Sequence, residues 1–205
     1  MMWSSSSRRK FLPARINGLT AWLVAALLAT VVSPMVAAQG PVDPALRERL
    51  RAAMTDSSSF PDRFDAQVWL TDMAIRLGNQ VADPAERVYI LRRAHWEATR
   101  VELPPEMILA VIDIESAFDS YAVSVAGAQG LMQVMPFWLD EIGLPDDRLV
   151  NIDTNLRMGC TILKYYYDME KGDWIRALGR YNGSLGSRKY PEKVLERLRS
   201  RWFRQ

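Results

Sequence analysis

One carboxylate, Glu115, stands out by its place in the chain. It ends the almost wholly apolar run 107–114, and a small-residue loop containing Gly127 and Gly130 follows it. A carboxyl group at the buried end of an apolar helix loses the hydration of its charged form, so we expect its pKa to rise. Such a group can hold a proton near neutral pH and act as a general acid. The alternative is a helix-end glutamate that faces solvent or pairs with an arginine, as most glutamates do.

Asp119 is the nearest rival acid. At four residues after Glu115 it would share a helix face with Glu115 if the helix continued. The sequence Asp-Ser-Tyr that starts at this residue instead indicates a loop or capping residue.

The elements that must position these groups are predicted to be helices. Pro104-Pro105 fits a helix start, and the run that follows is apolar on nearly every face, which is typical of a buried helix. Further helices are predicted within 64–77, from Asp83-Pro84, over 136–142, from 153 to about 171, from Asp173 toward Tyr181, and from Pro191, with a loop over 183–190. No segment demands a β-sheet, so the predicted fold class is mainly α.

A set of short motifs resembles the soluble lytic transglycosylase (SLT) family, whose catalytic domain has a goose-type-lysozyme-like fold. The matching residues are Glu115-Ser116, Ser124, Gly127-Ala128, Gly130-Leu131-Met132-Gln133, Met135-Pro136 and Tyr181-Asn182. They keep the family's order over roughly residues 86 to 200. The resemblance implies an enzyme that cuts the β-1,4 bond between N-acetylmuramic acid (MurNAc) and N-acetylglucosamine (GlcNAc) in peptidoglycan. Family members do so without adding water and leave a 1,6-anhydroMurNAc end.

The resemblance also implies a mechanism with one acid. Most glycosidases use two carboxylates, but an enzyme that lets the sugar's own C6 hydroxyl attack C1 can work with one. Glu115 would first protonate the leaving oxygen and then, as a carboxylate, take the proton of the C6 hydroxyl.

Five further residues are assigned to substrate binding by the same resemblance. Ser124 matches a family serine near the catalytic region, and Gln133 matches a glutamine that lines the groove. Tyr181 and Asn182 match the family's Tyr-Asn pair, whose tyrosine lies near the glutamate. Met135 is expected to give the groove an apolar floor.

Other interpretations of these residues stay open at this stage. Ser124 alone would be a turn hydroxyl, and Tyr181 alone a buried tyrosine. Met135 and the neighbouring Met132 fit core packing equally well. One departure is Gly183-Ser184, where many family members have Ala-Gly after the asparagine.

The beginning of the chain has the pattern of a signal peptide, predicted over residues 1–38. A basic start precedes the apolar run 19–32, and Val36-Ala37-Ala38 supplies small residues for cleavage. We therefore expect export to the periplasm, by the general secretory route or, because Arg8-Arg9 is present, by the twin-arginine route. An uncleaved leader would anchor the protein in the membrane. Residues 39–85 are predicted to be a short helical N-terminal extension, and residues 86–205 the catalytic domain.

Composition excludes several classes of function. The chain has 26 basic and 24 acidic residues, but four basic residues and no acid fall in the leader, so 22 basic residues remain beyond it. That balance gives no reason to expect nucleic-acid binding. His95 is the chain's one histidine and Cys160 its one cysteine, so we expect no metal site and no cofactor. We interpret His95 as a surface or helix-packing residue and Cys160 as a buried thiol. The C-terminal arginines are interpreted as a solvated face in preference to a site for an acidic polymer; they are Arg197, Arg199, Arg201 and Arg204.

Two other functions are compatible with the sequence. One is a lysozyme-like muramidase hydrolase, which would need a second carboxylate to position water. The other is a noncatalytic wall-binding subunit of a secretion or conjugation apparatus, which would have little need of Glu115. The expected partner is the peptidoglycan glycan strand in each case, and envelope secretion or conjugation machinery is a compatible second partner.

Overall fold

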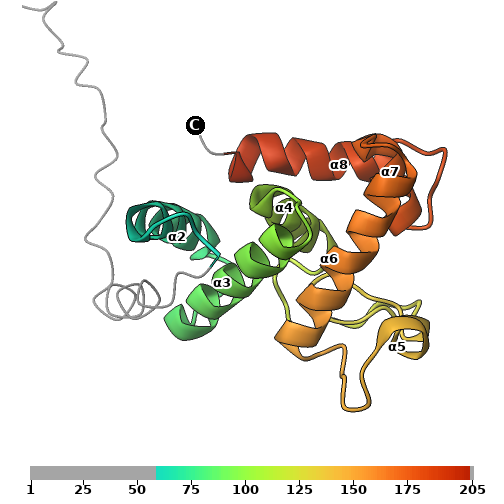
Figure 1. Cartoon of the computed structure of the whole chain (residues 1–205), viewed down its shortest axis with the longest axis horizontal. Helices are drawn as coiled ribbons and strands as arrows, with labels where there is room; N and C mark the ends of the chain where they lie inside the picture. The colour runs from blue at the N-terminus through green and yellow to red at the C-terminus, as the bar shows by residue number, and fades with distance from the viewer. Residues whose placement is uncertain (1–58, 204–205) are drawn as a thin grey trace, which may run out of the picture. The chain divides into compact units, whose positions relative to one another are not determined.

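The computed structural model describes residues 59–203, which form helices joined by loops, with a long loop over 116–136 between the helices that end at Glu115 and begin at Phe137 (Figure 1). The helices are α2 (Arg63–Leu77), α3 (Pro84–Arg100), α4 (Pro105–Glu115), α5 (Phe137–Ile142), α6 (Ile152–Met169), α7 (Trp174–Tyr181), α8 (Lys189–Arg197) and a π-helical turn, η1 (Leu198–Trp202). Extended pairing within this range is limited to isolated bridges of Gln129 with Val123 and with Val134. The mainly α prediction is confirmed. The predicted signal peptide lies outside the described residues.

Side-chain caps explain where several helices begin. The carboxylates of Asp62, Asp83 and Asp173 accept backbone N–H bonds at the starts of α2, α3 and α7. The predicted starts at Asp83 and Asp173 are thus confirmed. Helix α6 begins slightly earlier than expected, because Asn151 caps it by accepting from the backbone N–H of Thr154.

The last helix corrects the prediction that it starts at Pro191. Helix α8 begins at Lys189, so Tyr190 is helical and does not belong to the preceding loop. Proline is tolerated in a first helical turn because the N–H groups there have no acceptor within the helix. The proline therefore marked the first turn of α8 and not its first residue.

Helix α4 is the buried centre of the described fold. Its residues from Met107 to Asp113 are all buried, and it packs against α3, α8 and η1 (Figure 1). The prediction of a buried helix ending at Glu115 is confirmed. Its burial on nearly every face holds the end of the helix, and with it Glu115, in a fixed position.

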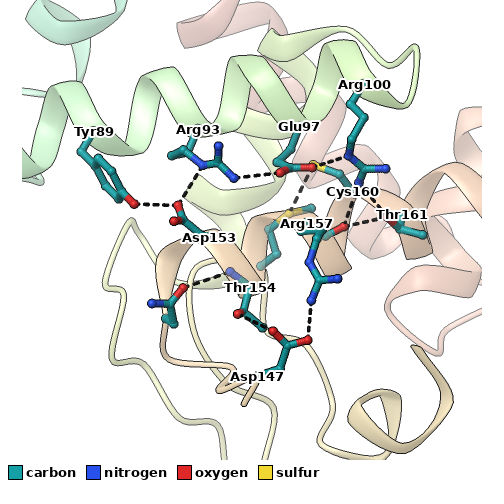
Figure 2. Close-up of polar contacts among 12 residues, drawn as sticks. Tyr89, Arg93, Glu97, Arg100, Asp147, Asp153, Thr154, Arg157, Cys160 and Thr161 are labelled. Atoms are coloured by element: carbon teal, nitrogen blue, oxygen red, sulfur yellow. Dashed lines mark hydrogen bonds and ion pairs between the residues drawn. The ribbon is translucent and has the colours of Figure 1, made fainter. Parts of the chain in front are cut away.

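Polar contacts tie α3 to α6 (Figure 2). Glu97 is buried and accepts from Arg93 at 3.0 Å and from Arg100 at 2.6 Å. Arg100 also donates to Thr161 on α6, and Arg93 forms an ion pair with Asp153 at the start of α6. The buried charge of Glu97 is thus compensated on both sides, as a buried carboxylate requires.

Helix α2 packs on α3 and touches η1. Its inner face, which includes Leu70, Met73 and Leu77, belongs to the same hydrophobic core as α4. The predicted division between residues 85 and 86 falls inside α3 and stays a prediction. No helix within residues 59–203 has the length and apolar character needed to cross a bilayer.

His95 and Cys160 are both buried, which fits the helix-packing interpretation of His95 over the surface one and confirms the buried thiol. Phe60 stacks on the His95 ring at 3.6 Å, and the edge of Trp69 meets it at 4.9 Å. Burial lowers the pKa of His95 to about 4, so the ring is neutral. Cys160 is fully buried beside Met132, and burial raises the pKa of its thiol.

Candidate active site

Glu115 lies in an open pocket at the end of α4. The pocket has a volume of about 370 Å³, and its walls come from the end of α4, the loop after α7 and the start of α8. Its lining residues are Ile114, Glu115, Asn182, Ser184, Ser187, Lys189, Tyr190 and Lys193. Two residues that were assigned from sequence, Glu115 and Asn182, are therefore brought together in one pocket.

The environment of Glu115 favours its protonated form. Burial raises the pKa of its carboxyl group to about 7, against the smaller and opposite effect of a hydrogen bond from Tyr190. The side chain is only partly buried, so the group also faces the pocket. A carboxyl group with this pKa can both give and accept a proton near neutral pH.

Tyr190 is the residue that contacts Glu115 directly. Its hydroxyl donates to Oε1 of Glu115 at 2.5 Å. Burial, together with the nearby charge of Glu115, raises the pKa of this phenol well above its usual value. Tyr190 therefore stays protonated near neutral pH and remains a hydrogen-bond donor to Glu115.

Tyr181 lies close to the same carboxyl group but holds a different partner. Its hydroxyl donates to the backbone carbonyl of Met132 at 2.7 Å. Burial raises the pKa of Tyr181 well above its usual value, and the charge of Glu115 adds to the effect. The role of Tyr181 beside Glu115 stays a prediction, and its hydrogen bond instead fixes the loop that contains Met132.

The loop between α4 and α5 is held against the end of α4 by side chains. Ser116 Oγ donates to the Leu131 carbonyl at 2.8 Å. The buried amide of Asn155 on α6 accepts from the Met132 N–H at 2.7 Å and donates to the carbonyls of Gln129 and Leu149. Ser116 and Asn155 thus connect the loop to the helix that carries Glu115 and to α6.

Gly130 is required where this loop passes Asn155. Its φ of +74° lies in the left-handed region, and a Cβ at this position would overlap the Asn155 side chain and the Leu149 carbonyl. The glycine in the Gly-Leu-Met-Gln motif therefore lets the backbone approach α6 closely.

The structure gives the polar loop residues defined contacts. Ser124 Oγ accepts from the Ala128 N–H at 3.0 Å, which is the turn contact expected of a loop serine. The Gln133 side chain donates to the carbonyls of Ala122 and Gly130 at 3.1 and 3.0 Å. Both side chains stabilise the loop, and neither is among the residues that line the Glu115 pocket.

The two methionines differ in their surroundings. Met132 is fully buried, and a Cβ at Gly159 would lie 2.5 Å from its sulfur, so it belongs to the core. Met135 is partly buried. Asn182 is exposed and accepts from the Ser184 hydroxyl at 3.0 Å.

The neighbouring acids have other roles. Asp119 is exposed and accepts from the Tyr121 N–H at 2.9 Å, so it is the predicted loop residue. Asp113 is buried and accepts from Arg197 at 2.7 Å, from Arg201 at 3.3 Å and from the Trp202 indole at 3.0 Å. The interpretation of the C-terminal arginines as a purely solvated face is wrong for Arg197 and Arg201, because Asp113 binds both of them.

Three contributors to the site were missed by sequence reasoning. The sequence predicts a loop at Tyr190 and gives Ser116 and Asn155 no role of their own. The sequence holds one usable signal. Proline is tolerated throughout the first turn of a helix, so a helix that contains Pro191 can begin before it and include Tyr190. The partner of an interior polar residue such as Asn155 depends on tertiary contacts and has no local signature.

The fold and the pocket define a helical domain that presents one partly buried carboxyl group to an open cavity. The sequence model of the family described as "Transglycosylase SLT domain" matches residues 94–200. The chain therefore belongs to this family, and the resemblance seen in its motifs is confirmed.

Individual relatives match shorter parts of the chain. A 39-residue segment is 54% identical to membrane-bound lytic murein transglycosylase C of Actinobacillus pleuropneumoniae serotype 5b (strain L20), covering 19% of this chain and 11% of the relative. A 99-residue segment is 30% identical to membrane-bound lytic murein transglycosylase D of Escherichia coli (strain K12), covering 45% and 22%. The chain thus matches less than a quarter of the length of either relative.

A solved structure of lytic transglycosylase Slt from Pseudomonas aeruginosa, an inactive mutant, is also similar. The TM-score is 0.48 at 22% sequence identity, over 77% of this chain and 36% of that one.

Proposed function

We propose that this protein is a peptidoglycan lytic transglycosylase that cleaves the MurNAc–GlcNAc β-1,4 bond without adding water. Support comes from family membership, from the similarity to murein transglycosylases C and D, and above all from one observation. Glu115 faces an open pocket with a pKa of about 7 and a hydrogen bond from Tyr190.

In the first step the Glu115 carboxyl group gives its proton to the glycosidic oxygen as the bond from C1 of MurNAc to that oxygen breaks. GlcNAc leaves with a hydroxyl group, and Glu115 becomes a carboxylate. The acetamido group of MurNAc stabilises the positive charge that develops at C1. Tyr190 keeps the carboxylate oriented through its hydrogen bond.

In the second step the C6 hydroxyl of the same MurNAc attacks C1. Its proton passes to the Glu115 carboxylate, and a 1,6-anhydro ring closes. The carboxyl group is regenerated without water entering the product. A single acid suffices for both steps, which agrees with Glu115 being the one carboxylic acid among the described residues that line its pocket.

The other assigned residues act around this centre. Asn182 faces the pocket and would contact sugar hydroxyls or acetamido groups. Tyr181, Ser124 and Gln133 would act mainly by holding the loop at the edge of the groove, through the contacts to Met132, Ala128 and Gly130. Met135 would supply apolar surface beside them.

This function is proposed for the periplasm. Cell-wall strands lie outside the cytoplasmic membrane, and the basic start, the apolar run and the small residues at 36–38 are a leader suited to export. A place in an envelope secretion or conjugation apparatus is compatible with the same activity, since such an apparatus must cross the wall.

The test is the release of soluble fragments from purified peptidoglycan by the protein, by Glu115→Gln and by Asp119→Asn. We expect Glu115→Gln to lower turnover by about a hundred- to ten-thousand-fold, as loss of a general acid does. Asp119→Asn is the matched control and should retain activity, because Asp119 only caps a loop. Equal activity of Glu115→Gln and the unchanged protein would overturn the assignment.

A further inference from the structure

A row of basic residues runs along the helix that starts beside the catalytic pocket. Lys189, Lys193, Arg197 and Arg201 are spaced four apart through α8 and η1. Residues four apart in a helix lie on one face. Lys189 and Lys193 both line the Glu115 pocket, so the row begins within the candidate active site.

The pocket continues along this row. Lys189, Lys193 and Ile114 also line a second, more open hollow of about 750 Å³, which reaches Arg197. Arg197 and Arg201 in turn line a third hollow, of about 630 Å³. The same side chains thus line both the Glu115 pocket and the hollows beside α8 and η1.

The two parts of the row differ in their partners. Arg197 and Arg201 are bound to the buried carboxylate of Asp113, which fixes the C-terminal end of the row on α4. Lys189 and Lys193 are exposed, and they face hollows that extend from the site of cleavage.

Two acids on the same helix, Glu192 and Glu196, form ion pairs with cations outside the row. Glu192 and Glu196 line the second hollow, but Glu192 pairs with Arg188 at 2.8 Å and Glu196 pairs with Arg199 at 2.8 Å. Neither glutamate lines the pocket that contains Glu115, so the positive charge of Lys189 and Lys193 remains there.

We propose that Lys189 and Lys193 bind carboxylates of the peptide stems that peptidoglycan carries on MurNAc, and so make the enzyme prefer stem-bearing over bare glycan strands. This inference rests on the proposed function, because it places a peptidoglycan strand in the Glu115 pocket. The stem is attached to the sugar next to the scissile bond, so its carboxylates and that bond must lie in neighbouring parts of one groove. An ammonium group binds a carboxylate through charge-assisted hydrogen bonds.

The test compares cleavage of stem-bearing strands with strands whose stems an amidase has removed. The variant is the double substitution Lys189→Gln with Lys193→Gln, and Lys189→Arg with Lys193→Arg restores the charge. The matched control, Lys164→Gln with Lys171→Gln, removes the same charge from α6 and the turn after it, away from the lining residues of the pocket.

We expect the glutamine variant to lower kcat/KM on stem-bearing strands by about tenfold more than on bare strands, mainly through KM. The arginine variant should recover most of this difference, and the control should match the unchanged protein. Equal losses on both substrates, or no loss on either, would overturn the role of the lysines.

Binding of the Glu115→Gln protein to both kinds of strand separates this inference from the proposed function. If the inactive protein binds stem-bearing strands more tightly and loses that preference with the two glutamines, the lysine site stands even where cleavage proves hydrolytic. Failure to discriminate in binding would count against the lysine site alone.

Discussion

The Tyr190 hydroxyl donates to Oε1 of Glu115 across 2.5 Å and joins the first turn of α8 to the last residue of α4. A phenol whose pKa lies well above its usual value keeps its own proton, so Tyr190 acts on the carboxyl group only as a hydrogen-bond donor. Donation to a carboxylate favours the charged form, which opposes the larger effect of burial.

Tyr190→Phe removes this donor and should raise the pKa of Glu115 above about 7. The alkaline limb of the pH–rate profile should then move to higher pH. Because hydrogen bonds to charged groups are worth about 1.5–3 kcal/mol, we expect kcat to fall roughly ten- to a hundred-fold. Tyr181→Phe is the matched control, since its hydroxyl donates to the Met132 carbonyl and the alkaline limb should not move upward.

Glu115→Gln should make stability less dependent on pH. The pKa of Glu115 in the folded protein, about 7, is raised, so folding binds a proton between the unfolded pKa and about 7. Stability of the unchanged protein should therefore fall as pH rises through that window, and the variant should lack this part of the fall. The free energy of unfolding of the variant minus that of the unchanged protein should be about 1–3 kcal/mol larger at about pH 8 than at about pH 4.

Urea unfolding of both proteins at the two pH values measures this difference. A constant difference between them across that range would show that the folded carboxyl group titrates normally.

Two glycines of one loop should respond differently to alanine. Gly130 and Gly127 both have positive φ, at +74° and +89°, but only a Cβ at Gly130 would overlap neighbouring atoms. We expect Gly127→Ala to cost about 1–2 kcal/mol from backbone strain, and Gly130→Ala roughly 2–5 kcal/mol, because overpacking adds to the strain. Thermal unfolding of the two variants tests this order, and similar losses would contradict the close approach to Asn155.

The buried acid two residues before Glu115 should matter for stability and not for chemistry. Asp113→Ala removes the carboxylate that the Arg197 side chain, the Arg201 side chain and the Trp202 indole share as an acceptor. Leaving the buried Trp202 indole N–H unsatisfied costs about 1–3 kcal/mol, and the loss of the two partly exposed ion pairs adds to this. The exposed Asp119→Ala should change stability by about 1 kcal/mol or less. Denaturant midpoints compare the two, and equal effects would argue against Asp113 as the anchor of η1.

Much of the helical framework could be predicted from local signals. The Asp83 and Asp173 caps, the proline start of α4 and the apolar run before Glu115 each act over a few residues, and the structure has them where the sequence indicated. The position of Glu115 at the end of a buried helix follows from the same local pattern.

The partners of polar side chains could not be predicted in this way. Tyr190 meets Glu115 across 75 positions of the chain, and Trp202 meets Asp113 across 89. Such pairs depend on how α4, α8 and η1 pack together, and periodicity does not encode that packing. The motif residues Ser124 and Gln133 were recognisable, yet their contacts with Ala128 and Gly130 became visible only in the folded loop.

We propose that Glu115 acts as the single acid and base while the substrate's own C6 hydroxyl closes the ring. The most direct test of this proposal is mass spectrometry of the fragments released when the protein digests peptidoglycan in water enriched in the heavy isotope of oxygen. We expect MurNAc ends that are anhydro and carry no heavy oxygen. Reducing MurNAc ends that carry one heavy oxygen atom from water would contradict it and establish a hydrolase.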